Sequence, residues 1–236
     1  MRSLKEGGAD GMHPISELEL TLNAYLRERG FVIESVGDVG SINDNFDTLG
    51  VHPWFPARSY SDICFLNSEK ILKKHNTGAI YSIIKERGAP CSIALLGRSF
   101  RCVTESPVTD LITFQYDGIM LDEGVSFSLG ARMVEDIIHN IFGIRDTRTV
   151  SKFFPYADPG FVLQGRCPDC LGRGCKRCEG KGYLNLCAYG ILHPGIVDEA
   201  LSVKDSGAVG FSFCFNLSKI AILKYNIKDV HELFIF

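Results

Sequence analysis

The sequence CSIALLGRSFRCVTESPVTDLITFQYDGIMLD occupies residues 91–122 and contains three segments rich in β-forming side chains. Residues 92–96, 98–104 and 113–121 are dominated by apolar and β-branched residues, which predicts strands, and residues 122–124 are typical of a turn. Strands that follow one another through short turns, with helices outside them, favour an antiparallel sheet over an alternating β-α winding. This stretch therefore predicts an α+β fold.

Helical periodicity flanks these strands. Residues 15–29, ISELELTLNAYLRER, place apolar side chains at helical spacing, with a capping box of Ser16 and Glu19 at the start and Gly30 at the end. Further elements are predicted as helices at residues 71–74, 79–87 and 129–142, and as strands at 31–33 and 183–188. We therefore expect a mostly antiparallel sheet flanked by helices.

The length of 236 residues suits one large or two small globular domains, and we expect a single domain over residues 1–236. Apolar residues make up 45% of the chain and charged residues 22%, which is ordinary for a protein with a sizeable core. The formal net charge of −3 excludes an overall basic field, although a local basic patch would still suit a nucleic acid. The N-terminus lacks the apolar core of a signal peptide, and the longest apolar stretch, residues 209–223, is interrupted and too short for a bilayer. We expect a cytoplasmic protein with no membrane partner.

Four cysteines fall within twelve residues, in the sequence CPDCLGRGCKRC that starts at Cys167. Two Cys-x-x-Cys pairs bring four thiolates within reach of one ion, and tetrahedral sulfur ligation is typical of structural zinc. Protein ligands would fill every position around the ion, which favours a structural over a catalytic role. We predict an inserted zinc knuckle over residues 165–182 with the ligands Cys167, Cys170, Cys175 and Cys178.

Other interpretations of these cysteines fit less well or stay open. The spacing does not separate zinc from iron, which takes the same geometry. A disulfide pairing does not suit a cytosolic chain. The Cys-x-x-Cys-x-Gly-x-Gly pattern also resembles the cysteine-rich domain of DnaJ chaperones, but that domain has several such repeats and this chain has one cluster.

Seven short blocks in a fixed order resemble the alpha subunit of phenylalanyl-tRNA synthetase, a class II aminoacyl-tRNA synthetase, over residues 12–236. The blocks are His13-Pro14, NFDTLGVHPWFPAR at 45–58 with Asp62, GRSFR at 97–101, FQYDGIMLD at 114–122, FPYADP at 154–159, GILHP at 190–194, and GFSF at 210–213 with LKYNIKD at 223–229. The resemblance implies a class II synthetase-type antiparallel sheet flanked by helices. It also implies a ligase that activates an amino acid, phenylalanine-like or a more polar relative, with ATP and transfers it to tRNA.

The catalytic residues implied by this resemblance are cationic. Arg101 matches the arginine that holds the ATP α-phosphate, and a planar guanidinium grips phosphate oxygens with two hydrogen bonds. Lys219 stands where the family has the arginine of its third motif, so the charge is kept without the planar fork. Cys214 and Asn216 replace glycines of the same motif, a departure that puts ATP binding in question.

The residues that match the family's amino-acid-binding positions depart less from the family pattern than those that match its ATP-binding positions. Gln115 and Asp117 match the pair that holds the substrate ammonium, and residues two apart on a strand share one face. The substrate side chain would lie beside Phe154, Tyr156 and Ser212. Two hydroxyl groups make this pocket more polar than the family pattern, which predicts a substrate that hydrogen-bonds, with plain core packing as the alternative.

Three further residues complete the predicted site. Glu105, where the family has a histidine, and its neighbour Ser106 are expected to bind substrate. Asp158 matches a glutamate implicated in magnesium binding, and a carboxylate oxygen suits that ion. The expected cofactors are therefore structural zinc and magnesium with ATP.

Three functions remain open for the chain taken as a sequence. The first is an aminoacyl-tRNA synthetase-like ligase with ATP and an amino acid as partners and tRNA as a possible third. The second is an adenylate-forming paralogue with an acceptor other than tRNA. The third is a non-catalytic subunit that binds an amino acid or tRNA. A homodimer or a second synthetase-like subunit is possible in each case.

Overall fold

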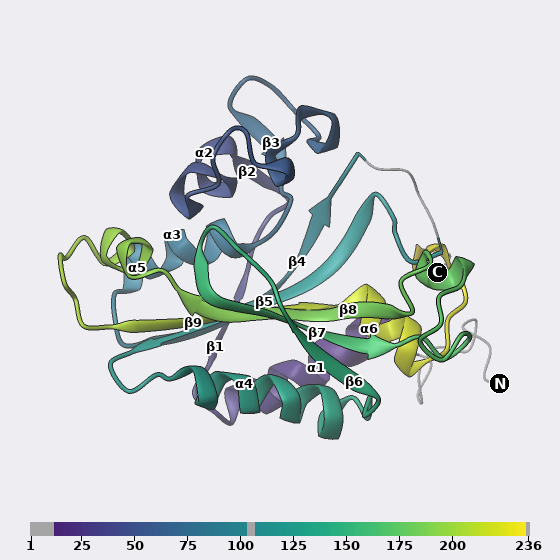
Figure 1. Ribbon diagram of the computed structural model, residues 1–236. Helices are drawn as coiled ribbons and strands as arrows, with labels where there is room; N and C mark the ends of the chain where they lie inside the picture. The colour runs from purple at the N-terminus through teal and green to yellow at the C-terminus, as the bar shows by residue number, and fades with distance from the viewer. Residues whose placement is uncertain (1–11, 103–106, 235–236) are drawn as a thin grey trace.

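A computed structural model describes residues 12–102 and 107–234 of the chain and shows a seven-stranded sheet between two layers of helices (Figure 1). The strand order is β1-β4-β5-β9-β8-β7-β6. β1 pairs with β4 in parallel, and every other neighbouring pair in this sheet is antiparallel. The predicted α+β class with a mostly antiparallel sheet is therefore confirmed, with one parallel edge strand.

The strands of this sheet are of unequal length, and the two shortest, β1 and β6, lie at its edges. Their bounds are β1 Val32–Ser35, β4 Cys91–Phe100, β5 Ile112–Asp122, β6 Thr147–Ser151, β7 Ala157–Arg166, β8 Tyr183–Leu192 and β9 Val209–Asn216. β2 (Val39–Ser41) and β3 (Lys70–Leu72) form a separate two-stranded sheet.

The larger hydrophobic core lies between one face of the sheet and three helices. These are α1 (Pro14–Arg27), α4 (Phe127–Asp136), which continues as a π-helical turn η5 (Ile137–Ile141), and α6 (Leu217–Lys224). Leu22 of α1 and Val134 of α4 are fully buried in this core together with Phe215 of β9. Burial of such side chains stabilises the fold by about 1.5–3 kcal/mol each.

The second core lies on the opposite face of the sheet, beneath α3 (Thr77–Arg87) and α5 (Pro194–Leu201). Side chains alternate along a strand, so Tyr116 of β5 faces the larger core whereas Ile119 faces the second. Both faces of the central strands are thus covered by helices.

A small lobe stands over the end of this second face (Figure 1). It contains β2, β3, α2 (Ile42–Asn45) and three short 3-10 helices, η2 (Asp47–Leu49), η3 (Pro56–Arg58) and η4 (Tyr60–Asp62). Phe46, Leu49, Val51, Ile63 and Ile71 form its own core. A last 3-10 helix, η7 (Val230–Phe234), ends the described chain, and η6 (Lys176–Cys178) lies in the cysteine cluster.

Some predicted elements have other bounds, and one is wrong. The first helix begins at Pro14 and is capped by His13, whose ring Nδ1 accepts the Ile15 N–H at 3.2 Å, so Ser16 lies inside the helix and does not cap it. Residues 71–74 were expected to be helical, but Ile71 lies in β3, because pairing with β2 overrides local helix propensity. The β6–β7 hairpin was not predicted at all.

Among the described residues, no helix is both long enough and apolar enough to cross a membrane.

Candidate active site and cysteine cluster

The candidate site is built on the face of the sheet that carries the second core, which we call the site face. On β5 this face presents Gln115, Asp117, Ile119 and Leu121 in sequence. Their Cα partners on β9 are Asn216, Cys214, Ser212 and Gly210. The site face therefore changes from polar to apolar along the strand direction, and Asp117 lies at the boundary.

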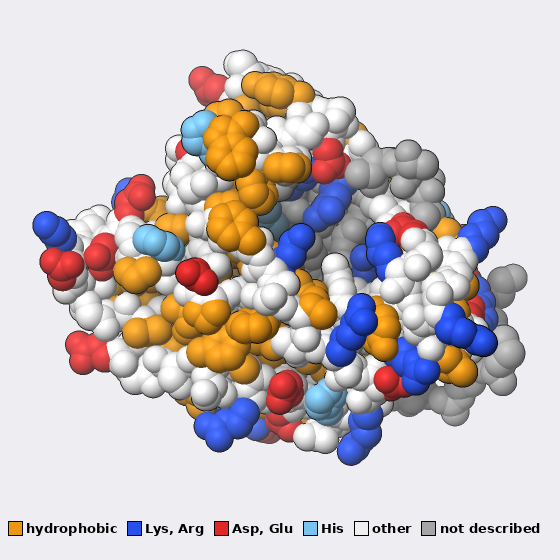
Figure 2. Space-filling model, in the orientation of Figure 1, with side chains coloured by type: hydrophobic (Ala, Val, Ile, Leu, Met, Phe, Trp, Pro, Cys, Tyr) orange, Lys and Arg blue, Asp and Glu red, His pale blue; other side chains and the backbone are white. Residues whose placement is uncertain are grey.

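A polar cleft with a cavity volume of about 370 Å3 opens at the Gln115 end of the site face. Arg101, Lys152 and Lys219 line it, and Figure 2 shows Lys and Arg side chains gathered in this hollow. Within the described ranges none of these three cations forms an ion pair with a carboxylate. The acid in the cleft lining, Asp110, lies 3.5 Å from the His231 ring. The cleft is thus an electropositive site suited to an anion.

Lys219 is positioned by the start of α6. Asn216 caps this helix, and its side-chain oxygen accepts the Lys219 backbone N–H at 2.9 Å. Burial lowers the pKa of the Lys219 ammonium, the Glu179 carboxylate opposes this effect, and the Lys181 and Arg101 charges lower the pKa further. An anionic ligand would offset the lowering of the Lys219 pKa, since it adds negative charge beside the ammonium.

Asp117 is buried and held by a short chain of hydrogen bonds. Asn76 Nδ2 donates to Asp117 Oδ2 at 3.1 Å, and Thr77 Oγ1 donates to Oδ1 at 3.4 Å. Behind them, Lys73 Nζ donates to Asn76 Oδ1 at 2.8 Å. Burial raises the pKa of Asp117 to about 6, against the lowering effect of its hydrogen bonds from Asn76, Cys214 and Thr77.

Gln115, two residues before Asp117, has an unsatisfied acceptor. Its Oε1 atom is buried and has no hydrogen-bond partner among the described residues. A buried oxygen without a partner costs about 1–3 kcal/mol, so a ligand that donates a hydrogen bond here gains that free energy back. Gln115 and Asp117 together therefore offer a hydrogen-bond acceptor and a carboxylate to one cationic donor.

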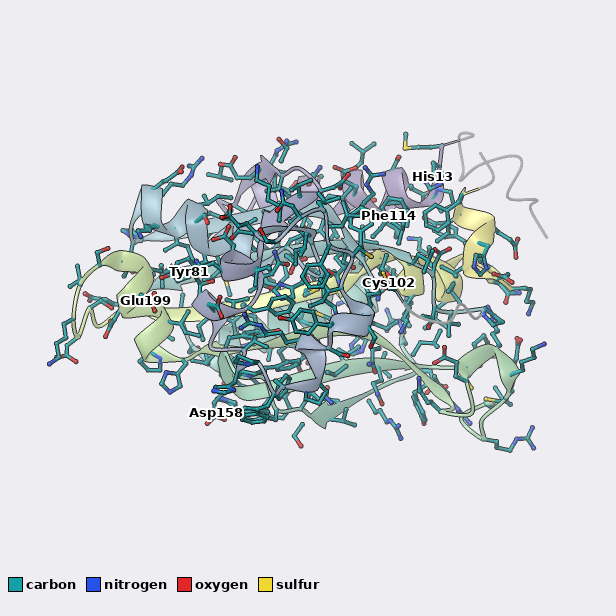
Figure 3. The ribbon with its side chains drawn as sticks, turned by 90° about the horizontal axis from the view of Figure 1, so that it is seen from above. His13, Tyr81, Cys102, Phe114, Asp158 and Glu199 are labelled. Atoms are coloured by element: carbon teal, nitrogen blue, oxygen red, sulfur yellow. The ribbon has the colours of Figure 1, made fainter. Side chains whose placement is uncertain are left out.

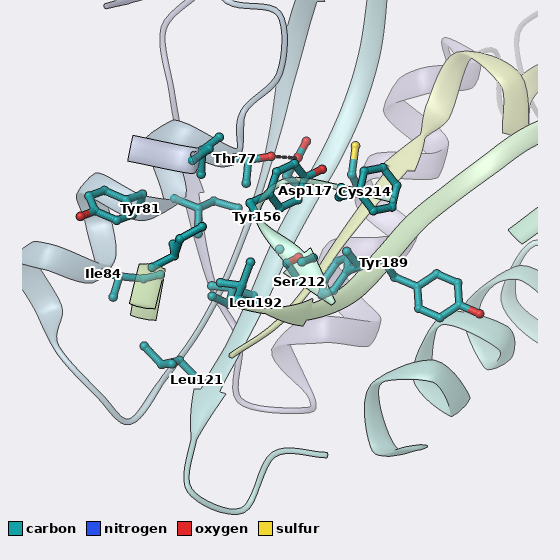
Figure 4. Close-up of a pocket in the computed structure, with 18 of the residues that line it drawn as sticks. Thr77, Tyr81, Ile84, Asp117, Leu121, Tyr156, Tyr189, Leu192, Ser212 and Cys214 are labelled. Atoms are coloured by element: carbon teal, nitrogen blue, oxygen red, sulfur yellow. Dashed lines mark hydrogen bonds between the residues drawn. The ribbon is translucent and has the colours of Figure 1, made fainter. Parts of the chain in front are cut away.

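An apolar slot continues from Asp117 along the site face, away from the polar cleft (Figure 4). Phe154 and Tyr156 stack with ring centroids 5.5 Å apart, and both line the slot together with Ser212. Burial raises the pKa of Tyr156, and the neighbouring Cys214 and Asp117 groups raise it further, so its hydroxyl stays protonated. The structure thus brings the three predicted pocket residues together with Asp117.

Sequence reasoning missed the residues that hold Asp117. Lys73, Asn76 and Thr77 belong to the polar run KKHNT at 73–77, which is typical of an exposed loop. In the structure Lys73 and Asn76 are only 4% and 0% exposed. No local signal distinguishes such a run, because its partner Asp117 lies about forty residues further along the chain.

The remaining predicted residues lie elsewhere. Asp158 is exposed on β7 and lines neither the polar cleft nor the apolar slot. Figure 3 shows it near the end of the molecule that carries Tyr81 and Glu199, away from Cys102, the neighbour of Arg101. Glu105 and Ser106 lie outside the described residues.

The four clustered cysteines are arranged as the corners of a tetrahedron. Their sulfur atoms all lie within 4.8 Å of one another, and three pairs are 3.7 to 3.8 Å apart. A tetrahedral ion with metal–sulfur bonds of about 2.3 Å separates its sulfurs by about 3.8 Å. The donor set therefore fits a four-coordinate metal, and no other group of three or more such ligands is found among the described residues.

Backbone N–H groups support the negative charge of this cluster. Cys175 N and Gly182 N donate to Cys178 Sγ at 3.2 and 3.1 Å. These hydrogen bonds outweigh the effect of burial and lower the pKa of Cys178 to about 7. Gly182 adopts a φ of +74°, and a Cβ there would lie 2.2 Å from the Gly172 carbonyl oxygen, so only glycine fits.

Arg177 links the cysteine cluster to α6 and to the segment that follows it. Arg177, which is 6% exposed, donates to Asp169 at 2.7 Å and to the carbonyl oxygens of Ile227 at 2.6 Å and Ile222 at 3.3 Å. Ile222 lies in α6, the helix whose first turn contains Lys219. On the other side, Thr109 of the polar cleft donates to Glu179 at 2.8 Å. The segment with the four cysteines therefore contacts two sides of the polar cleft, α6 and the segment that contains Thr109.

The fold and the site together define a class. A mostly antiparallel sheet carries an electropositive cleft beside a pocket that ends in a buried carboxylate. This arrangement can hold a polyanion and a small zwitterion side by side, which is what a class II aminoacyl-tRNA synthetase core requires. A family model described as "tRNA synthetases class II core domain (F)" matches residues 3–235, and the chain belongs to this family.

Relatives and solved structures agree with this assignment. The phenylalanine–tRNA ligase alpha subunits of Desulfosudis oleivorans and Francisella philomiragia are 28% and 26% identical to the chain over 225 and 226 residues. Those matches cover 94% of this chain and 66% of each relative, so the chain spans somewhat less than two thirds of their length. Two structures of pyrrolysyl-tRNA synthetase from Desulfitobacterium hafniense superpose with TM-scores of 0.70 and 0.69 at 16% identity, covering 96% of this chain and 75% and 74% of theirs. The predicted resemblance and the class II fold are thereby confirmed.

Proposed function

We propose that the chain is a ligase that activates an amino acid with ATP and transfers it to tRNA. The observation that carries this proposal is the position of Gln115 and Asp117. They offer an unsatisfied buried oxygen and a carboxylate at the boundary between the polar cleft and the apolar slot. An amino acid whose ammonium lies here would direct its carboxylate toward the cleft and its side chain into the slot.

The residues of the cleft suit the activation step. A carboxylate oxygen of the amino acid attacks the α-phosphorus of ATP, the bond to the β-phosphate oxygen breaks, and pyrophosphate leaves with the electron pair. Negative charge is gathered on the phosphates, so fixed cations are the main requirement. We assign Arg101 to the α-phosphate and Lys219 to the distal phosphates, because both line the cleft and, among the described residues, neither forms an ion pair with a carboxylate.

Magnesium would accompany the nucleotide. When bound, Mg2+ neutralises phosphate charge and keeps several of its waters, so it needs only one or two protein ligands. The described residues form no cluster of acidic ligands in the cleft, and Asp158 lies outside its lining. We therefore propose that the phosphates, rather than a protein cage, hold the magnesium.

The partners follow from the relatives. They are named phenylalanine–tRNA ligase alpha subunits, so we propose tRNA as the acceptor and a second subunit or a second copy of the chain as the assembly partner. We propose structural zinc for the cysteine cluster, because the sulfur geometry matches and all four corners are protein ligands.

The test is amino-acid-dependent exchange of pyrophosphate into ATP, across the twenty standard amino acids and O-modified serine and tyrosine. We expect exchange with at least one of them, since the assay requires only the first half-reaction and no acceptor. Exchange without charging of any tRNA would indicate an adenylate-forming enzyme with another acceptor. Absence of exchange with zinc-loaded protein and every amino acid would contradict the proposal and favour a non-catalytic binding subunit.

Amino-acid binding is expected to weaken in acid. The raised pKa of Asp117 means that its carboxyl becomes neutral as the pH falls through about 6, while the ligand ammonium stays charged. The dissociation constant for phenylalanine, or for whichever amino acid supports exchange, should rise about tenfold between pH 7 and pH 5. Calorimetric titration across this range measures it.

Asp117→Asn provides the control for this pH dependence. The amide cannot ionise, so binding should be weaker at pH 7 and nearly flat down to pH 5. An unchanged affinity of the native chain across the range would show that Asp117 does not hold the ammonium.

A further inference from the structure

Two cysteines outside the four-cysteine cluster lie against each other beside the polar cleft. The Sγ atoms of Cys64 and Cys102 are 2.7 Å apart, and both residues are free thiols. Cys64 belongs to the small lobe, between η4 and β3, whereas Cys102 lies beyond the end of β4 and directly follows Arg101 of the cleft lining. The two cysteines are 38 positions apart in the sequence, so the fold, and not a local motif, brings them together.

The distance between these two sulfurs favours a direct bond over a shared metal ion. Two sulfurs on one tetrahedral ion are about 3.8 Å apart, whereas a disulfide joins its sulfurs at about 2.05 Å. Three sulfur pairs of the four-cysteine cluster are 3.7 to 3.8 Å apart, but Cys64 and Cys102 are much closer than that. Among the described residues, no third cysteine, histidine or carboxylate ligand atom lies within 4.8 Å of both sulfurs. The pair is therefore arranged as two thiols that a small movement of the sulfur atoms can join.

The two thiols differ in accessibility and in acidity. Cys102 is exposed, whereas Cys64 is partly buried. Burial raises the pKa of the Cys64 thiol to about 11, and the neighbouring Cys102 and Asp62 groups raise it as well, against the lowering effect of Lys74. The thiolate is the nucleophile in disulfide exchange, and it must reach its target from solvent. Cys102 is thus the thiol that a reagent in solution meets first, and Cys64 is the second to react.

We propose that Cys64 and Cys102 are a modification site at which a low-molecular-weight disulfide, such as oxidised glutathione, forms a reversible bond between the small lobe and the segment that carries Arg101. The Cys102 thiolate attacks one sulfur of the reagent, the reagent's sulfur–sulfur bond breaks, and one thiolate leaves with the electron pair. Cys64, after giving its proton to that thiolate, attacks Cys102 Sγ and displaces the second one. The two cysteines lose two electrons and two protons, and the reagent gains them as two thiols.

The position of the bond gives it a consequence for the site. In the reduced chain the lobe contacts the end of β4 through a hydrogen bond from the Phe100 N–H to the Lys73 carbonyl oxygen at 2.8 Å. A disulfide adds a covalent link beside this contact, and so restrains Arg101 relative to the lobe. A reducing compartment keeps such a pair as thiols, so the bond forms when the surroundings become oxidising. This proposal does not depend on the reaction that the chain performs.

Oxidation of the full zinc-loaded chain with oxidised glutathione tests the site. Peptide mapping by mass spectrometry without reductant should find a peptide that joins Cys64 to Cys102, with zinc content unchanged, and dithiothreitol should separate the two halves again. The oxidised chain should have a Tm about 5–10 °C above that of its reduced form, because the cross-link restricts the unfolded chain. Separate thiols at both positions after oxidation, or glutathione retained on Cys102 beside a free Cys64, would overturn the proposal.

Two serine variants provide matched controls, each compared with its own reduced form. Cys64→Ser removes the second thiol, so glutathione should stay on Cys102 and oxidation should not raise the Tm. Cys91→Ser changes a partly buried cysteine at the other end of β4, so the linked peptide and the rise in Tm should both be kept. An equal rise in Tm in Cys64→Ser would show that the stabilisation arises at other cysteines and would contradict the assignment.

Discussion

Arg101→Ala is expected to lower the rate of amino-acid-dependent pyrophosphate exchange by about 100- to 1,000-fold, the usual loss when one preorganised donor to the transition state is removed. Arg101 lies just beyond the end of β4 and lines the polar cleft, and it forms no ion pair with a carboxylate of the described residues. Its backbone N–H donates to the Leu111 carbonyl oxygen at 2.9 Å, a bond that alanine keeps. The variant should therefore fold normally and fail in catalysis.

Two control variants distinguish the effect of the Arg101 charge from that of its paired hydrogen bonds, and both from a general effect on folding. Arg98→Ala removes an arginine of β4. The guanidinium of Arg98 pairs with Asp38 outside the cleft, so the rate of exchange should be unchanged. Arg101→Lys keeps the charge without the two-pronged hydrogen bonding and should recover only part of the activity. Native activity in Arg101→Ala would remove this residue from the site.

Loss of the metal from the cysteine cluster is expected to destabilise the whole chain. Purified protein should contain about one zinc per chain. Cys178→Ser removes a ligand that is fully buried. A loss of about 5 kcal/mol, part of what structural zinc contributes, corresponds to a fall of about 10–20 °C in Tm for a domain of this size. Elemental analysis and thermal unfolding measure the two effects.

The expected damage extends beyond the cluster because of Arg177. This side chain joins the knuckle to α6 and to the segment that follows it, so loss of the metal should also displace Lys219. Cys102→Ser changes an exposed cysteine outside the cluster and should alter neither metal content nor Tm. A metal-free chain with native stability would refute the structural role, and one iron in place of zinc would correct the identity of the ion.

The grouping of the four cysteines was predicted, and the strands of residues 91–122 were predicted in part, because both signals are local. Four thiolates at short spacing reach one ion whatever the rest of the chain does, and side-chain alternation marks β4 and β5 within ten or so residues each. Arg101 and Lys219 both line one cleft although more than a hundred residues separate them, and their catalytic role stays a prediction. That prediction came from the ordered motifs of a family, which carry tertiary information.

Other features of the site could be learned only from the tertiary structure, because they depend on contacts between segments that are distant in the sequence. The hydrogen bonds from Asn76 to Asp117 and the exposed position of Asp158 follow from how strands and loops meet in space. The lining of the apolar slot depends on the register of β5 against β9 and on the packing of α3 above them. Register is a property of the assembled sheet, and a shift of one residue would turn every one of these side chains to the opposite face. The sequence of this chain therefore determined its family and the grouping of its four cysteines, whereas only the packed sheet determined the polarity of the space around Asp117.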